Sequence, residues 1–531
     1  GGGGGGSSSS SSAAPPPSPR PMEEEARGEK RSATPTRPGS WLDAAQERAG
    51  SPQKTQRLSA VLAYAAAQNQ PTCADVDEAW ALETCQHHSM LRPIYDSASG
   101  VELRPELVRE ARWEEVDEIR KHKVYRKVLR QMAKDRGKRV IGTRWVDINK
   151  GDDINPNYRA RFVAKELRAF SPFTPQEDLC AATPPTAAQN LLLSMLCARR
   201  SRRGPAYKLV FLGVRRAFFY AEATEEVFVE LPNEDKEPGK DLVWLLLKSL
   251  YGTRSAAKNW LLRLAKDLAS LGFKQALSSP CIFYHPDHAA RLVIHGDDLW
   301  LLADQPALEV LKPKLHQIYT LKENGTLGPD ATDDKAATTP NRQVRYTDGL
   351  GEEIEADPRH AELIVAELGM EEAKAVTTPG VKEAEPADAD AQLITDLSES
   401  TAYRGISARG LYLSIDRPEM KFAAKELARK MAKPTQAGMR SLKRLGRCLR
   451  GRPRLVVVYR LQGAAAGERD PDFLYIPVDS NWADCRETRR STSGGALVHG
   501  RHVLATWSVT QSIQALSSGE AEFYAVLRGA V

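Results

Sequence analysis

Two adjacent aspartates, Asp297 and Asp298, stand between two apolar segments of the chain. The apolar segments, residues 291–294 and 299–302, are typical of buried strands, so the sequence His295-Gly-Asp-Asp298 is expected at the tip of a hairpin. Like charges at this spacing repel each other, and a divalent cation would relieve the repulsion. Carboxylates from neighbouring strands hold the cations in two-metal phosphoryl transfer. A Gly-Asp-Asp sequence is also an ordinary turn, and the motif alone favours that reading.

Apolar periodicity predicts the elements that must position these acids. Upstream we expect an amphipathic helix over residues 105–131, a basic β-hairpin formed by residues 139–146 and 158–165, a helix over 184–200 and a strand over 207–212. A helix over residues 255–271, capped by Gly272, precedes the acidic hairpin. Downstream of residue 341 the chain is acidic and contains Pro and Gly, then helical between 402 and 449. Strands around residues 474–478 and 495–507 and a helix from about Ser517 complete the pattern.

Charge and composition set limits on the protein class. The net charge of +6 is weak evidence for a polyanionic partner, but residues 111–168 hold 17 Lys and Arg against 9 Asp and Glu, so positive charge is concentrated there. The seven cysteines are scattered singly, without a CxxC pair, which favours a reduced, intracellular chain, cytoplasmic or nuclear. No apolar run approaches the roughly 18 residues that a membrane span needs, and no signal sequence is expected.

A series of short motifs runs through the chain in a fixed order. They are Gly142-Thr-Arg-Trp145, Tyr158-Arg-Ala-Arg-Phe-Val-Ala-Lys165, Phe211-Leu-Gly-Val-Arg-Arg-Ala-Phe-Phe219, Lys248-Ser-Leu-Tyr-Gly252 and His295-Gly-Asp-Asp298, followed by Ala402-Tyr-Arg404, Asp416-Arg-Pro-Glu419 and Lys443-Arg-Leu-Gly446. Each motif is weak alone, whereas the ordered set resembles the reverse transcriptase region of Copia-type retrotransposon Pol polyproteins. The resemblance implies metal-dependent addition of deoxynucleotides to a DNA primer on an RNA template, with Mg²⁺ (or Mn²⁺) as the cofactor.

The resemblance assigns roles to particular residues. Asp297 and Asp298 are expected to be catalytic and to bind the metal. Arg159 and Arg161 are expected to bind the triphosphate of the incoming nucleotide, because guanidinium groups match phosphate oxygens, although both could be solvated strand residues. Phe218 occupies the position of an aromatic side chain that blocks a ribose 2′-hydroxyl, although plain core packing would also explain it.

The chain departs from the family pattern at one chemically decisive position. The first metal-binding carboxylate is expected at the end of the strand before Val214, where this chain has Gly213. In addition, His295 replaces an aromatic residue, and Ser255 is nearest in register to a usual glutamine. Because the loss of one shared ligand should cost several kcal/mol in the transition state, we expect impaired catalysis. The alternative is a non-catalytic remnant that binds nucleic acid.

A second resemblance, to the RNase H domain of the same family, covers the end of the chain. Its motifs are Val478-Asp-Ser-Asn-Trp-Ala483, Thr488-Arg-Arg-Ser-Thr-Ser-Gly494, Thr506-Trp-Ser508 and Ala515-Leu-Ser-Ser-Gly-Glu-Ala-Glu-Phe-Tyr524. It implies that Asp479 and Glu522 are catalytic metal ligands acting on an RNA–DNA hybrid. Glu520 is a second possibility for the helix acid, and a turn residue and a surface acid are the ordinary alternatives.

The predicted architecture is α+β. It comprises a disordered low-complexity N-terminus (1–54), a linker or upstream remnant (55–105), the fingers and palm of a right-hand polymerase (106–330), a thumb or connection (331–470) and a truncated α/β RNase H-like domain (471–531). The expected partners are RNA template, DNA primer, RNA–DNA hybrid and deoxynucleoside triphosphates, without a membrane. The oligomeric state is open.

Overall fold

A computed structural model of the chain describes residues 93–166, 181–198, 206–339, 342–381, 392–462 and 473–530. The disorder predicted for residues 1–54 and most of the predicted linker lie outside these ranges. Helices and strands are mixed along the described chain, so the predicted α+β class is confirmed. No helix in the described ranges combines the length and the apolar composition that crossing a membrane would require.

A six-stranded antiparallel sheet carries the acidic hairpin. Its order is β10-β11-β12-β13-β7-β14. The strands are β7 (Tyr207–Val214), β10 (Lys274–Gln275), β11 (Ile282–His285), β12 (Ala290–His295), β13 (Asp298–Asp304) and β14 (Leu321–Leu327). The strands predicted at 207–212, 291–294 and 299–302 are therefore confirmed. Nearly every residue of β7 and β13 is buried, because the sheet is covered on both faces.

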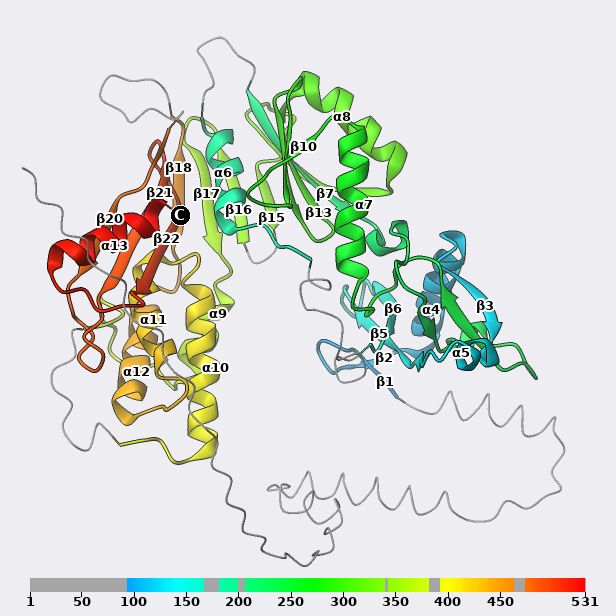
Figure 1. The fold of residues 1–531 in the computed structure, drawn as a ribbon, viewed down its shortest axis with the longest axis horizontal. Coiled ribbons are helices and arrows are strands. Elements are labelled where there is room, and N and C mark those ends of the chain that lie inside the picture. Colours follow the sequence, from blue (N-terminus) through cyan, green and yellow to red (C-terminus); the bar gives the residue numbers. More distant parts are fainter. Residues whose placement is uncertain are drawn as a thin grey trace, which may run out of the picture. The chain divides into compact units, whose positions relative to one another are not determined.

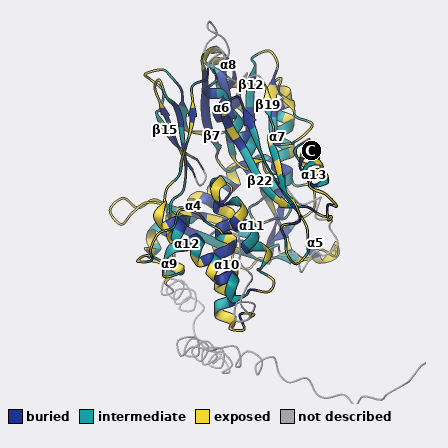
Figure 2. Ribbon diagram, turned by 90° about the vertical axis from the view of Figure 1, so that its left-hand side faces the viewer, coloured by how far each residue is buried: buried dark blue, intermediate teal, exposed yellow. Residues whose placement is uncertain are grey.

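Helices α7 (Ala256–Ser270) and α8 (Gln305–Ile318) cover one face of this sheet, and α6 (Thr186–Leu196) covers the other (Figure 1). Alternation along the strands divides the core accordingly. Val210 and Leu212 of β7 pack with α7 and α8, whereas Leu209 and Phe211 pack with α6. Strands β7 and β12 are mostly dark blue in Figure 2, as expected for strands that are covered on both faces.

The N-terminal part of the described chain forms a second assembly of strands around α4 (Pro105–Lys121). Its members are the hairpins β1 (Ile94–Tyr95) with β2 (Glu102–Leu103) and β5 (Thr143–Asn149) with β6 (Tyr158–Ala164), the four-stranded sheet β3 (Tyr125–Leu129), β9 (Leu242–Leu246), β8 (Phe228–Val229) and β4 (Val140–Ile141), helix α5 (Arg130–Asp135) and the short helices η3 (Ala217–Tyr220) and η4 (Asn233–Asp235). The basic hairpin is confirmed. The helix predicted over 105–131 was wrong beyond Lys121, because residues 125–129 pair instead with distant β9.

A four-stranded sheet that was not predicted from the sequence follows β14. It consists of β15 (Ala336–Thr339), β16 (Arg342–Thr347), β17 (Gly351–Ala356) and β18 (Val456–Arg460). The helical segment predicted between residues 402 and 449 is confirmed as α10 (Leu397–Leu413), η6 (Pro418–Met420), α11 (Lys421–Arg429) and α12 (Gln436–Gly451). Helix α9 (Arg359–Glu367), which was not predicted, packs into the same hydrophobic core. Strand β17 pairs with β18, which lies about 100 residues later in the chain. The pairing that completes this sheet is therefore not visible in a short stretch of sequence.

The C-terminal elements form a small sheet with one helix against it. The strands are β19 (Leu474–Tyr475), β20 (Val478–Asn481), β21 (Thr492–His499) and β22 (His502–Thr510), and the helix is α13 (Ser518–Ala530). Helix α13 packs on β20 and β21, and α6 and α11 pack against β22. The predicted strands and helix of this region are confirmed.

Candidate active site

The acidic hairpin is a two-residue turn that neighbouring elements hold in place. His295 and Asp298 are directly opposite in the β12–β13 ladder, and the turn between them consists of Gly296 and Asp297. Gly296 has a φ of 67°, which suits glycine at the first position of such a turn. The indole Nε1 of Trp260 in α7 donates to the carbonyl oxygen of Gly296 at 2.8 Å. The two aspartates are therefore fixed at the end of the sheet.

Gly213 lies immediately beside these acids. It is the ladder partner of Asp298 in β13 and of Lys322 in β14. A Cβ atom built at residue 213 would lie 3.6 Å from Oδ1 of Asp298. A carboxylate at this position would thus join Asp297 and Asp298 at one point. Across the described residues, no group of three or more His, Cys, Asp or Glu side chains is arranged to hold a metal ion.

Burial and the repulsion between like charges disfavour the ionised form of Asp298. Burial raises the pKa of the Asp298 carboxyl group, and the neighbouring charge of Asp297 raises it further. His295 and Lys322 oppose this shift without reversing it. A cation between the carboxylates would reverse the balance, because it favours the ionised form of both.

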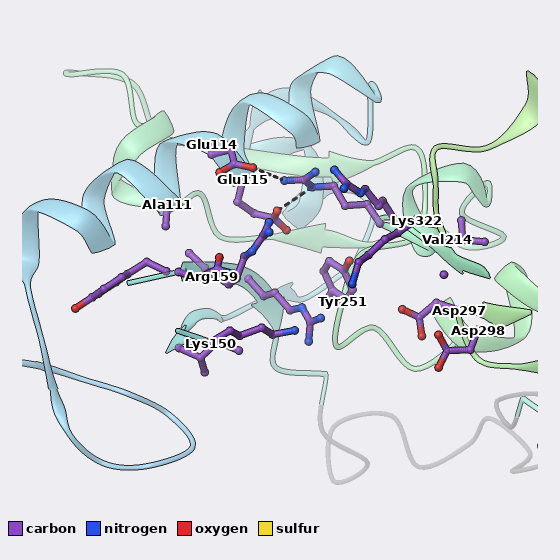
Figure 3. Close-up of a pocket in the computed structure, with 18 of the residues that line it drawn as sticks. Ala111, Glu114, Glu115, Lys150, Arg159, Val214, Tyr251, Asp297, Asp298 and Lys322 are labelled. Carbon is purple, nitrogen blue, oxygen red and sulfur yellow. Dashed lines mark hydrogen bonds and ion pairs between the residues drawn. The ribbon is translucent and has the colours of Figure 1, made fainter. Parts of the chain in front are cut away.

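The acids share a cavity of about 440 Å³ with the basic hairpin. Lys150, Arg159 and Arg161 line its opposite wall, and Figure 3 shows Lys150 and Arg159 facing Asp297 and Asp298 across the space. Arg159 and Arg161 are exposed and alternate with buried residues of β6, so both project from the same face of the hairpin. The structure therefore brings two of the predicted metal ligands, Asp297 and Asp298, to the same cavity as the predicted phosphate ligands, Arg159 and Arg161.

An ion-pair cluster on the wall of this cavity was not foreseen from the sequence. Arg216 has a φ of 53° and pairs with Glu114 at 3.4 Å, Glu115 at 3.1 Å and Glu118 at 3.5 Å, all on α4. Burial raises the pKa of Glu115, an effect that Arg216 partly offsets, and Oε1 of Glu115 is buried without a hydrogen-bond partner. Burial, assisted by the charge of Glu115, raises the pKa of the nearby Tyr251 to about 12. Only the spacing of three glutamates along one helix could have hinted at this cluster.

Phe218 does not line the cavity. It is half-buried in η3, and its ring packs against that of Tyr251 with the centroids 5.3 Å apart. Tyr251 lines the cavity, as does Tyr158 of the basic hairpin. Phe218 therefore contacts a side chain of the cavity wall without lining the cavity itself.

The two acids of the C-terminal region lie on adjoining elements. Asp479 is exposed on β20, and Oε1 of Glu522 in α13 accepts a hydrogen bond from the backbone N–H of Ser480 at 3.2 Å. Glu522 is thereby held next to Asp479. Glu520, in contrast, accepts from the backbone N–H of Leu516 at 2.7 Å and so caps the start of its own helix. Neither Asp479 nor Glu522 lines the cavity of Asp297 and Asp298.

Comparisons with known proteins identify the part of the chain that contains Asp297 and Asp298. Residues 123–329 match the family described as reverse transcriptase (RNA-dependent DNA polymerase). The chain is 26% identical over 401 residues to the retrovirus-related Pol polyprotein from transposon RE1 of Arabidopsis thaliana, covering 73% of this chain and 25% of that protein. It is 24% identical over 423 residues to the corresponding polyprotein from transposon TNT 1-94 of Nicotiana tabacum, covering 78% and 30%.

The chain thus spans about a quarter of the length of the curated relatives it matches. Among solved structures, a foamy viral protease-reverse transcriptase in complex with double-stranded DNA is similar with a TM-score of 0.42 and 13% identity, over 83% of this chain and 65% of that one. That score is too low to establish a common fold. Residues 123–329, which include Asp297 and Asp298, thus match a reverse transcriptase domain, and most of the chain is similar to the Pol polyproteins of Copia-type retrotransposons.

Proposed function

We propose that the cavity is the site of RNA-directed DNA synthesis, and that Gly213 weakens the reaction. In this reaction the 3′-hydroxyl of a primer loses its proton and attacks the α-phosphorus of a deoxynucleoside triphosphate, and pyrophosphate leaves. The proposal depends mainly on one observation, namely that acidic and basic side chains face each other across the same cavity. Asp297 and Asp298 lie on one wall, and Arg159 and Arg161 lie on the other. A triphosphate needs both, because its phosphates require cationic partners and its bridging metal requires oxygen ligands.

The donor set fits a single hard cation better than a pair. Mg²⁺ is commonly held by one or two carboxylates together with water and substrate phosphates, and Asp297 and Asp298 supply two carboxylates. Bound Mg²⁺ or Mn²⁺ would neutralise charge on the reacting phosphate. Arg159 and Arg161, with Lys150 beside them, would orient the triphosphate. Phe218 is proposed to affect discrimination against the ribose 2′-hydroxyl through the ring of Tyr251.

The test is primer extension on an RNA template by the present chain and by Gly213→Asp. Gly213 does not have a positive φ, and its nearest obstruction is the end of the Asn324 side chain at 3.3 Å, so an aspartate fits after a small rotamer change. If the missing ligand costs about 3 kcal/mol, Gly213→Asp should raise the rate about 100-fold. Gly213→Ala adds the Cβ without a carboxylate and should give no increase.

Two further variants make the result decisive. Adding Asp298→Asn to Gly213→Asp should abolish the gain, because the restored carboxylate would then lack its partner. A folded Gly213→Asp protein that extends no primer faster than the present chain would contradict the proposed role of this position. Circular dichroism of each variant separates that result from misfolding.

The second candidate function is binding of primer–template without catalysis. It is favoured by the finding that, in the described ranges, no group of three or more His, Cys, Asp or Glu side chains is arranged to hold a metal ion. Binding through phosphates depends steeply on salt concentration. Fluorescence anisotropy of a labelled primer–template should show this dependence, and Arg159→Ala should reduce its slope. Binding that is indifferent to salt would exclude this candidate.

The proposal also assigns a subdomain to each part of the chain. Residues 106–330 would form fingers and palm, 331–470 a connection, and 471–531 an RNase H-like region in which Asp479 and Glu522 hold a metal that promotes cleavage of RNA in RNA–DNA hybrids. The hydrogen bond from Ser480 to Glu522 supports this pairing. Cleavage of a labelled hybrid should fall in Asp479→Asn and Glu522→Gln but not in Glu520→Gln.

An intracellular location, cytoplasmic or nuclear, belongs to the same proposal. Four cysteines in the described ranges are free thiols, Cys197, Cys281, Cys448 and Cys485. Free thiols persist where the compartment is reducing. Microscopy of the tagged chain in a host cell would test the location, and an exclusively secreted product would contradict it.

A further inference from the structure

A β-bulge directs Asn324 into the cavity beside the acids. In the pairing of β14 with β7, Glu323 lies opposite Leu212 and Gly325 lies opposite Phe211, which leaves Asn324 without a ladder partner. Gly325 has a φ of 134°, a conformation that favours glycine and that permits the irregularity. Bulges next to functional sites commonly re-aim a side chain, and Asn324 lines the same cavity as Asp297 and Asp298.

The end of the Asn324 side chain lies next to the position that a Cβ atom at residue 213 would take. A Cβ atom at Gly213 would lie 3.3 Å from Nδ2 of Asn324 and 3.6 Å from Oδ1 of Asp298. These two polar atoms therefore flank one point in the cavity. The oxygen and nitrogen of a terminal amide exchange places by a half-turn about the last side-chain bond, so the same position is open to the carbonyl oxygen.

We propose that the side-chain carbonyl oxygen of Asn324 is a third ligand for the cation held by Asp297 and Asp298, in the place left open by Gly213. This inference rests on the proposed function, because it concerns the same metal. Asparagine carbonyl oxygens are ordinary ligands of hard cations. The ligand is neutral, so it leaves the site one negative charge short of a three-carboxylate set, and nearby Lys322 lowers the affinity for a cation further.

Substitutions of Asn324 distinguish a metal ligand from a side chain that makes no contact with the ion. As a ligand, it contributes oxygen to the ion, and Asn324→Asp strengthens binding while Asn324→Ala weakens it. As a mere space filler or as a donor to Asp298, it makes no contact with the ion, and removing it leaves cation affinity unchanged. Because Asn324 is exposed and outside the ladder, neither substitution should disturb folding.

The experiment measures Mn²⁺ affinity by the electron paramagnetic resonance signal of free Mn²⁺, at fixed pH and without nucleic acid. We expect Asn324→Ala to raise the dissociation constant about tenfold and Asn324→Asp to lower it about tenfold, each change corresponding to about 1.4 kcal/mol. Asn157→Ala is the matched control, because Asn157 is an exposed asparagine that lines the same cavity near the basic wall. It should leave the affinity unchanged.

A double variant sharpens the test. In Gly213→Asp the new carboxylate displaces the amide, so adding Asn324→Ala should change Mn²⁺ affinity little relative to Gly213→Asp alone. If Asp298→Asn weakens Mn²⁺ binding and Asn324→Ala does not, the role of Asn324 is refuted while the metal site of the proposed function stands. If Asp298→Asn also leaves binding unchanged, the metal site itself is refuted, and this inference with it.

Discussion

Glu352 gives the sharpest prediction about stability. Its side chain is fully buried in β17, where its ladder partners Tyr346 and Tyr459 are also buried, and neither carboxyl oxygen has a hydrogen-bond partner. Burial raises the pKa of Glu352 well above its ordinary value near 4.5. The folded protein therefore holds a proton on Glu352 that the unfolded chain releases at about pH 4.5.

The sign of the pH effect follows from this difference in bound protons. Between the unfolded and the folded pKa of Glu352, the folded state carries one more proton, so the free energy of unfolding falls as pH rises, by about 1.4 kcal/mol per pH unit. Glu352→Gln should remove this slope. Glu352→Met should in addition stabilise the fold by about 2 kcal/mol, because it replaces two unpaired buried oxygens with apolar atoms.

Urea unfolding at pH 5 and pH 7 measures both effects. Glu353→Gln is the control, since Glu353 is the next residue of β17 and is partly exposed. It should preserve the slope and change stability by less than about 0.5 kcal/mol. A Glu352→Met protein that is less stable than the present chain would show that the carboxyl group has a stabilising partner, and the reasoning from burial would be wrong.

Two other residues give predictions of the same kind. Burial lowers the pKa of His502 to about 4 from its ordinary 6.5. The neutral imidazole therefore contributes its full stabilisation above pH 6.5, and this contribution is lost as the pH falls towards 4. Urea midpoints measured in the Glu352→Gln background should show this loss, and the additional change His502→Gln should remove the dependence on pH. Asp235, whose side chain is 1% exposed, pairs with basic residues and accepts from Trp244 at 2.8 Å. Asp235→Asn should cost about 3 kcal/mol in the same assay, whereas Asp241→Asn, which breaks a more exposed ion pair, should cost less than about 1 kcal/mol; equal costs would refute the role of burial.

Local sequence was sufficient where the signal lies within a few residues. The turn at Gly296 follows from two apolar strands separated by residues that favour turns. The alternation of Arg159 and Arg161 with buried neighbours fixes which face of the hairpin is basic. The order of motifs then predicted that Gly213 would lie beside Asp298, and the ladder of β7 with β13 confirms it.

The sequence failed where a partner lies far along the chain. Residues 125–129 form a strand because they pair with β9, although their apolar periodicity continues that of the preceding helix. The sheet closed by β18 was missed for the same reason.

The finer features of the site depend on tertiary structure alone. Neighbours in the chain do not determine the positive φ of Arg216 or the bulge that exposes Asn324 to the cavity. The spacing of the glutamates on α4 does not by itself show that Arg216 is their partner. Sequence determines periodicity, turn chemistry and the identity of the reactive groups, because these depend on neighbours in the chain. Contacts between distant parts of the chain determine strand register and burial, and they bring the acidic and basic walls of the cavity together. The partner of each strand or side chain therefore depends on the rest of the fold.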